Sequence, residues 1–139
     1  MFDYQAPPEL LKSKIILVTG AGDGIGKAAA LSYAKHGATV ILLGRTVSKL
    51  EAVYDEIESQ GYPKPAIIPM NLEGSVEKGY IDVANSIDEE FGRIDGILHN
   101  AALLGSMCSI EQYEVPVWEQ MMQVNVNAPF MLTKTLLPL

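Results

Sequence analysis

Gly20, Gly24 and Gly26 are three of the four glycines in the stretch TGAGDGIG, which lies between an apolar segment and an alanine-rich segment. Glycine permits a tight turn and a close approach of the backbone to a ligand. The start of a helix adds unpaired N–H groups and the positive end of the helix dipole. These features together suit a phosphate or pyrophosphate group. We therefore expect an anion site at this turn.

Two common nucleotide-binding patterns do not fit the stretch. A P-loop that used Lys27 would need glycine where Ala21 stands and a magnesium-binding hydroxyl where Ala28 stands. The strict GxGxxG pattern would need glycine at Ile25 or Lys27. The spacing that fits is TGxxxGxG, and it is occupied by Thr19, Gly20, Gly24 and Gly26.

The surrounding pattern predicts the elements that position this turn. Apolar runs predict buried strands over residues 14–19, 39–43, 66–70 and 94–99. Helical periodicity predicts helices over 25–36, 46–60, 75–91 and from Pro116 toward Leu139. Ser48 and Glu51 have the spacing of a capping box for the second helix. Residues 1–13 are expected to form an N-terminal arm, and residues 14–139 a single cofactor-binding domain.

Strands that alternate with crossover helices predict an α/β fold with a doubly wound parallel sheet. Pro69 cannot donate to a sheet ladder, so the third strand should lie at an edge. The strand order is then 3-2-1-4, the order of a Rossmann fold. Ligands of such sheets bind beyond the carboxyl ends of strands one and four, where the order reverses. The glycine turn lies at that point.

Composition narrows the class of partner. The 139 residues carry a net charge of −7, which argues against nucleic acid. No apolar run approaches the roughly 18 residues of a membrane span, and the N-terminus lacks the features of a secretory signal. Cys108 is the single cysteine, so it has no intrachain disulfide partner, and we expect it to serve packing. A reducing, cytoplasmic setting fits this usage.

The motifs resemble those of the short-chain dehydrogenase/reductase family. TGAGDGIG is similar to its glycine motif, and Asn71-Leu72 follows the third strand where the family usually has Asp and an aliphatic residue. The stretch HNAA at 99–102 resembles the family's NNAG, with Ala102 in place of glycine. VNVN at 124–127 resembles the segment with the active-site Asn. The stretches ILLGR, LHNA and MQVNVNA are similar to the bacterial YciK-type oxidoreductases of this family.

The resemblance implies a nicotinamide dinucleotide as the cofactor. The cofactor-binding residues that it implies are Thr19, Gly20, Gly22, Asp23, Gly24, Ile25, Gly26, Arg45, Asn71, Leu72, Asn100, Ala101 and Ala102. Gly44 stands where the family's NAD enzymes carry Asp, and the adjacent Arg45 can bind a 2′-phosphate with two hydrogen bonds. We expect NADP rather than NAD, although Asp23 opposes this where NADP enzymes often have a basic residue or Ser. The alternative for Arg45 is a solvated surface side chain.

Family chemistry implies a Tyr as the general acid with a Lys four residues later. None of the tyrosines here has Lys at that spacing, and the family places the pair on a helix beyond the one that ends this chain. The one catalytic residue implied here is Asn125. Pro129 has no N–H and clashes with the carbonyl of Asn125, which frees that carbonyl to hold a water. The alternative is that Pro129 merely kinks the helix. We expect His99 to pack or cap rather than catalyse.

The leading hypothesis is an NADP-dependent oxidoreductase that moves hydride between the cofactor and a small carbonyl or alcohol substrate. This chain would be its cofactor-binding portion, without a metal. The alternative is a non-catalytic module that binds the dinucleotide. Trp118, Met121 and Met122 are expected in the core or at a subunit interface. The resemblance implies a homodimer or homotetramer.

Overall fold

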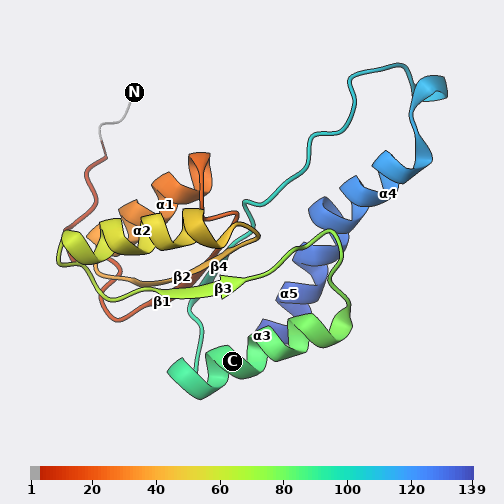
Figure 1. Cartoon of the computed structure of the whole chain (residues 1–139). Helices are drawn as coiled ribbons and strands as arrows, with labels where there is room; N and C mark the ends of the chain where they lie inside the picture. The colour runs from red at the N-terminus through yellow and green to blue at the C-terminus, as the bar shows by residue number, and fades with distance from the viewer. Residues whose placement is uncertain (1–3) are drawn as a thin grey trace.

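The computed structural model of the chain describes residues 4–139, in which four parallel strands alternate with helices (Figure 1). The strand order is β3-β2-β1-β4, so the predicted Rossmann topology is confirmed. The elements are β1 (Ile15–Thr19), α1 (Gly24–Lys35), β2 (Thr39–Gly44), α2 (Val47–Ser59), β3 (Ala66–Pro69), α3 (Glu77–Phe91), β4 (Gly96–Leu98), α4 (Val115–Met122) and α5 (Ala128–Leu136). Pro69 ends the edge strand β3, as its missing N–H predicts.

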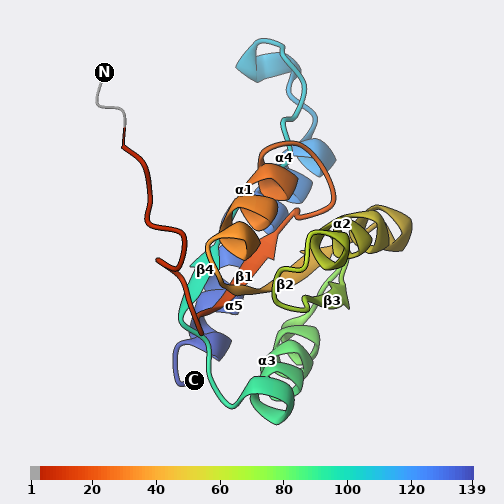
Figure 2. The same cartoon turned by 90° about the vertical axis from the view of Figure 1, so that its left-hand side faces the viewer.

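The two central strands divide the core into two layers because successive side chains of a strand point to opposite faces. Leu17 and Ile41 are fully buried on the face covered by α3 and α5. Val18 and Val40 are fully buried on the face covered by α1 and α2 (Figure 2). Both faces of β1 and β2 are therefore dry, which explains their unbroken apolar sequences.

The second helix begins differently from the prediction. Thr46 is its N-cap, and no side-chain hydrogen bond caps that end. Ser48 and Glu51 lie inside the helix, so the predicted capping box is wrong. A capping box forms only when its first residue is the N-cap itself.

The last predicted helix is divided into three parts. A π-helical segment, Gln123–Asn127, separates α4 from α5, and Pro129 is near the start of α5. The N–H of Ala128 donates to the carbonyl of Gln123, five residues earlier. Pro129 lacks the N–H that would donate to the carbonyl four residues earlier in a regular α-helix. The wider π-helical turn beside it is consistent with this missing hydrogen bond.

The end of the predicted arm is attached to the domain. Leu11 packs against the layer under α1, and its N–H donates to the carbonyl of His36 at 2.9 Å. Residues 1–3 of the predicted arm lie outside the described residues.

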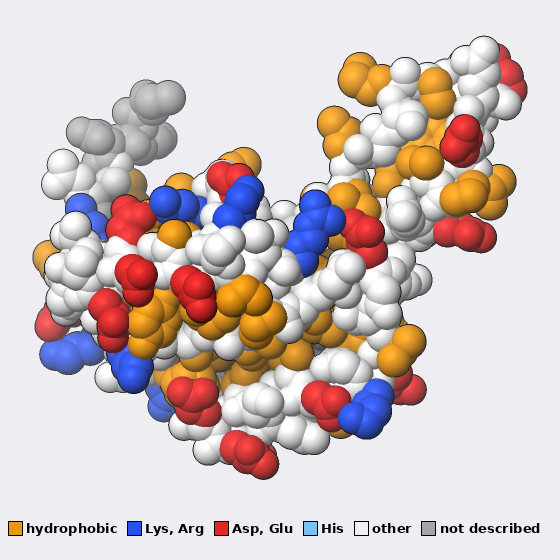
Figure 3. Space-filling view, viewed as in Figure 1, with side chains coloured by type: hydrophobic (Ala, Val, Ile, Leu, Met, Phe, Trp, Pro, Cys, Tyr) orange, Lys and Arg blue, Asp and Glu red, His pale blue; other side chains and the backbone are white. Residues whose placement is uncertain are grey.

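The segment between β4 and α4 projects away from the sheet and carries exposed apolar side chains (Figures 1 and 3). Leu104, Met107 and Ile110 are at least 90% exposed. Cys108 is exposed as well, so the expectation that it serves packing is wrong. No helix among residues 4–139 is both long and apolar enough to span a membrane.

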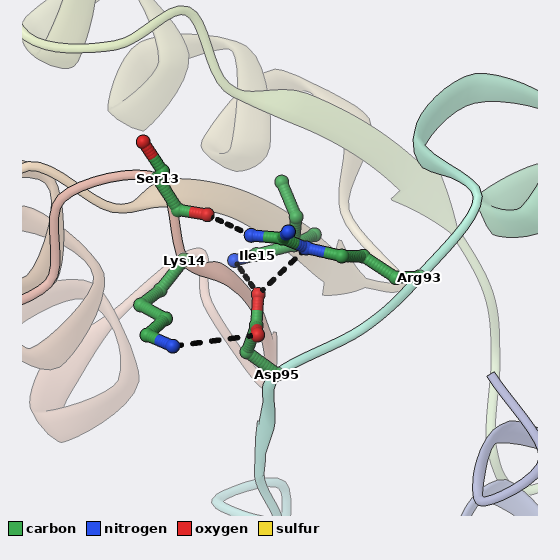
Figure 4. Close-up of polar contacts among 5 residues, drawn as sticks. All are labelled: Ser13, Lys14, Ile15, Arg93 and Asp95. Carbon is green, nitrogen blue, oxygen red and sulfur yellow. Dashed lines mark hydrogen bonds and ion pairs between the residues drawn. The ribbon is translucent and has the colours of Figure 1, made fainter.

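A single carboxylate joins the starts of β1 and β4 (Figure 4). The N–H of Ile15 donates to Asp95 Oδ2 at 2.8 Å. Arg93 Nε lies 3.3 Å from the same oxygen, and Lys14 Nζ lies 3.7 Å from the other. Arg93 also donates to the carbonyl of Ser13. The backbone hydrogen bond from Ile15, followed by the charges of Arg93 and Lys14, lowers the pKa of Asp95.

We expect Asp95→Asn to lower the free energy of unfolding by about 1–2 kcal/mol at pH 7, because a charged acceptor is replaced by a neutral amide. A lowered native pKa gives stability above the ordinary pKa near 3.8 that is lost as the pH falls through the native value. The difference between the two proteins should therefore shrink below about pH 4. Urea unfolding across pH 3–7 measures it. Asp55→Asn, at an exposed site on α2, is the control and should change little.

Candidate functional site

A cleft of about 410 Å³ opens at the carboxyl ends of the strands, between the halves of the sheet where the order reverses. Parallel strands place the residues that follow them at one edge of the sheet. Most of the predicted cofactor-binding residues meet here. They are Gly20, Gly22 and Asp23 after β1, Arg45 after β2, Asn71 and Leu72 after β3, and Asn100, Ala101 and Ala102 after β4.

Thr19 and Asn100 hold the ends of β1 and β4 together. The buried Thr19 hydroxyl oxygen accepts the N–H groups of Asn100 and Ala101, both at 3.0 Å. The Asn100 side-chain amide donates back to the carbonyls of Thr19 at 3.1 Å and Gly20 at 3.3 Å. Thr19 thus supports the cleft floor from below rather than lining it.

The glycine turn follows the end of β1, and it leaves no room for a side chain at Gly20 or Gly26. Gly20 has a φ of +65°, which favours glycine, and Gly24 has a φ of +53°. A Cβ at Gly26 would lie 2.5 Å from Asn100 Nδ2 and would collide with the Gly20 carbonyl oxygen. Helix α1 therefore begins in direct backbone contact with the strand end. Such close packing of a helix on a strand end requires glycine at this position.

The N-terminus of α1 has open space at Gly24, next to the part of the turn that lines the cleft. A Cβ at Gly24 would meet no atom within 4 Å. Asp23 is the N-cap, and its carboxylate accepts the N–H of Gly24 at 2.8 Å. The other amides of the first helical turn are the donors that fit a pyrophosphate. The space in front of the backbone and the donor set together fit a dinucleotide.

Four charged side chains line the cleft mouth in two ion pairs. Arg45 donates to Glu73 Oε1 at 2.8 Å, with side chains 64% and 29% exposed. Lys49 donates to Asp23 Oδ2 at 2.8 Å, with side chains 55% and 78% exposed. The Lys49 hydrogen bond and the Gly24 N–H lower the pKa of Asp23, so Asp23 is charged at neutral pH. Solvent-exposed pairs of this kind are weak and exchange partners readily.

Asn71 shapes the wall formed after β3. Its side-chain oxygen accepts the N–H of Glu73 at 3.1 Å, and its carbonyl accepts the Ser75 hydroxyl at 2.6 Å. This turn places Glu73 beside Arg45. Leu72 is 7% exposed and contributes apolar surface to the same wall.

Asn125 lies outside the cleft lining and acts on it through one neighbour. Its side-chain oxygen accepts the Leu103 N–H at 2.8 Å, and its amide donates to the Leu103 carbonyl at 2.9 Å. Leu103 lines the cleft, as does Val124. The π-helical segment therefore fixes the chain just after Ala102.

Four other predicted binding residues are placed beside the cleft rather than in its lining. Thr19, Gly24 and Gly26 belong to the support and the turn described above. Ile25 is 80% exposed in the first turn of α1.

Two residues predicted to lack a catalytic role have structural partners. The His99 ring lies 3.0 Å from the Thr133 hydroxyl of α5, and burial lowers its pKa. The side chain is otherwise exposed, so of the two expected roles this hydrogen bond agrees with capping rather than packing. Trp118 is 55% exposed and meets Tyr113 edge-on, with ring centroids 6.4 Å apart, so it is not in the core.

Sequence reasoning missed Lys49 and Glu73. Lys49 is in the first turn of α2, four residues after Arg45, and the start of that helix faces the cleft because it follows a strand end. Glu73 follows β3 in the same way. The topology could have indicated both positions. Their partners could not be inferred, because long charged side chains reach several neighbours.

Comparison with known proteins gives consistent matches over nearly the whole chain. The family model for short chain dehydrogenase matches residues 14–139. The uncharacterised oxidoreductase YciK of Escherichia coli K12 is 47% identical over 136 residues, which cover 98% of this chain and 54% of that protein. The chain spans about half the length of the curated relatives it matches.

Solved structures agree. A Pseudomonas syringae protein superposes with a TM-score of 0.96 at 55% identity, covering 100% of this chain and 56% of the other. A Shigella flexneri protein in complex with NADP superposes with a TM-score of 0.92 at 46% identity, covering 96% of this chain and 56% of the other.

We expect Gly26→Ala to lower the free energy of unfolding by about 3 kcal/mol, because the added methyl collides with the Gly20 carbonyl and the Asn100 amide. Gly74→Ala is the matched control, since a Cβ there meets no atom within 4 Å. It should change stability by less than about 0.5 kcal/mol. Urea unfolding measures both. Equal stability of the two variants would contradict the close contact at Gly26.

Proposed function

The chain belongs to the short-chain dehydrogenase family, and from that premise we propose that it is the cofactor-binding portion of an NADP-dependent oxidoreductase. The reaction transfers hydride between the nicotinamide and a small carbonyl or alcohol substrate. Residues 14–139 form the cofactor-binding domain in this proposal. This chain spans about half the length of its curated relatives, so the activity is proposed for the whole protein.

The observation that carries the proposal is the pair Gly44–Arg45 at the end of β2. A carboxylate there would hydrogen-bond the ribose diol of NAD and repel a 2′-phosphate. Gly44 removes that carboxylate, and Arg45 places an exposed guanidinium in the cleft beside it. Its pair with Glu73 is solvent-exposed and therefore easily exchanged for a phosphate. The NADP complex of the similar Shigella protein supports the same choice.

The chain's own residues would divide the work of holding the cofactor. The backbone of the turn from Gly20 to Gly26 would hold the pyrophosphate. The wall of Asn71 and Leu72 would face the adenine, and Asn100 to Ala102 would border the nicotinamide half. The cofactor, when bound, supplies or accepts the hydride. The protein's part is to orient it and keep its reactive end beside the substrate.

We further propose that Asn125 serves the proton path of the whole enzyme. The family resemblance supports it through the matching VNVN segment. Two local features agree with it: Pro129 withholds an N–H from the Asn125 carbonyl, and the π-helical segment widens the turn there. π-Helical turns are frequent at functional sites. The side chain of Asn125 would act as a positioning group through Leu103.

A second copy of the protein is the proposed partner of α4 and α5. Val115, Trp118 and Phe130 are 65%, 55% and 63% exposed on these helices. Exposed apolar side chains gathered on neighbouring helices favour association. A homodimer or homotetramer would cover them.

We expect Arg45→Gln to raise the Kd of NADPH at least tenfold, an estimate of about 1.4 kcal/mol or more from a lost charged hydrogen bond. The Kd of NADH should stay within about twofold, because NADH lacks the 2′-phosphate. Fluorescence titration of both cofactors measures this. Lys78→Gln, on α3, is the control. A clear preference of the unmodified protein for NADH would overturn the choice of cofactor.

We expect Asn125→Ala in the full-length enzyme to lower kcat by roughly tenfold or more, because the chain at Leu103 and the proton path are both disturbed. The Kd of NADPH should change less than about threefold, since the glycine turn is untouched. Steady-state kinetics and cofactor titration separate the two effects. Asn127→Ala, two residues further on, is the control. Unchanged turnover in Asn125→Ala would rule out the role.

Binding of NADPH without any turnover in the full-length protein would favour the non-catalytic module.

A further inference from the structure

Lys49 and Asp23 form an ion pair across the mouth of the cleft, between the first turn of α2 and the glycine turn. Lys49 Nζ lies 2.8 Å from Asp23 Oδ2. The stem of the lysine lies against the turn itself, because a Cβ at Gly22 would be 3.0 Å from Lys49 Cβ. The ammonium is thus tethered beside the backbone that holds the pyrophosphate in the proposed function.

The charges that line the cleft are balanced within the protein. Arg45 and Lys49 are the cations, and Glu73 and Asp23 are their partners. A phosphate monoester carries a charge between −1.5 and −2 near pH 7. One arginine alone leaves part of that charge uncompensated. A second cation within reach would complete the site.

We propose that Lys49 is that second cation: it binds the 2′-phosphate of NADP together with Arg45, and Asp23 is its counter-ion while no phosphate is bound. The inference rests on the proposed function and adds a residue that determines cofactor specificity. It also explains why a site that binds an anion contains the acidic Asp23. Asp23 holds the lysine in place, and the lysine cancels the repulsion from Asp23.

The geometry permits the exchange of partners. Both side chains of the pair are more than half exposed, at 55% and 78%, so water screens their attraction. The lysine has a flexible stem of four carbons and a compact ammonium with three donors. Arg45 precedes α2 by two residues and Lys49 is in its first turn, so both project from one short segment. A phosphate placed between them would also gain from the positive end of that helix.

The test is Lys49→Gln in the full-length protein, with NADPH and NADH as the probes. The Kd of NADPH should rise about fivefold to tenfold, as expected for a lost charged contact in a solvated site. The Kd of NADH should stay within about twofold. Lys49→Arg should retain most of the NADPH affinity. Adenosine 2′,5′-bisphosphate and AMP both lack the nicotinamide, and only the first carries the 2′-phosphate. By calorimetry, Lys49→Gln should weaken the binding of the bisphosphate and leave the binding of AMP within about twofold.

The control is Lys27→Gln, since Lys27 is on α1, pairs with Glu56 at 3.1 Å and does not line the cleft. It should leave both Kd values unchanged. A second background, Asp23→Asn, separates direct contact from charge cancellation. If Lys49 binds the phosphate, Lys49→Gln still weakens NADPH binding in that background, and Asp23→Asn alone strengthens it.

Two results would overturn the inference. One is an unchanged ratio of the NADPH and NADH Kd values in Lys49→Gln. The other is a Lys49→Gln effect that disappears in the Asp23→Asn background, which would limit Lys49 to cancelling the charge of Asp23. Either result leaves the proposed function intact as long as Arg45→Gln still weakens NADPH binding. Loss of the proposed function itself would appear as no binding of either cofactor to the unmodified protein.

Discussion

The contact between the start of α1 and the ends of β1 and β4 is the constraint on which the site depends. Gly26 brings the helix backbone against the Gly20 carbonyl and the Asn100 amide. Asn100 can occupy that place because Thr19 accepts two backbone N–H groups from the end of β4. These hydrogen bonds join the ends of β1 and β4 directly. A helix start held this close to two strand ends presents its free N–H groups at a fixed point.

The cleft therefore combines a rigid floor with an adaptable rim. The floor is backbone and the buried or half-buried side chains of Thr19 and Asn100, whose positions are set by packing and by hydrogen bonds. The rim is made of exposed charged side chains such as Arg45 and Lys49, held in weak pairs. Shape and orientation of a ligand come from the floor. Selection between ligands that differ by one phosphate comes from the rim, where charge can be rearranged at little cost.

The fold could be predicted from the sequence because its signals are local. The unbroken apolar run of β1 and the missing N–H of Pro69 each depend on few neighbours, and together they fix the strand order. The glycine turn was predictable for the same reason. Three features were not: the N-cap at Thr46, the partner of Lys49 and the partner of Arg45. The two ion-pair partners depend on which groups the tertiary structure brings together, because long charged side chains reach several neighbours.

The division of the last helix shows how a sequence pattern can leave open two structures. Pro129 was compatible with a simple kink or with a locally free carbonyl at Asn125. The wider π-helical turn accommodates the missing N–H and the ring of Pro129. It leaves the core packing intact, because Val124 and Ala128 remain buried. Asn125 is then left facing Leu103, where its amide bonds both backbone groups of the cleft wall. A regular helix would lose the hydrogen bond to the Asn125 carbonyl and would also meet the proline ring at that carbonyl. The wide turn is therefore the arrangement in which the core packing, the proline and the cleft wall are all accommodated.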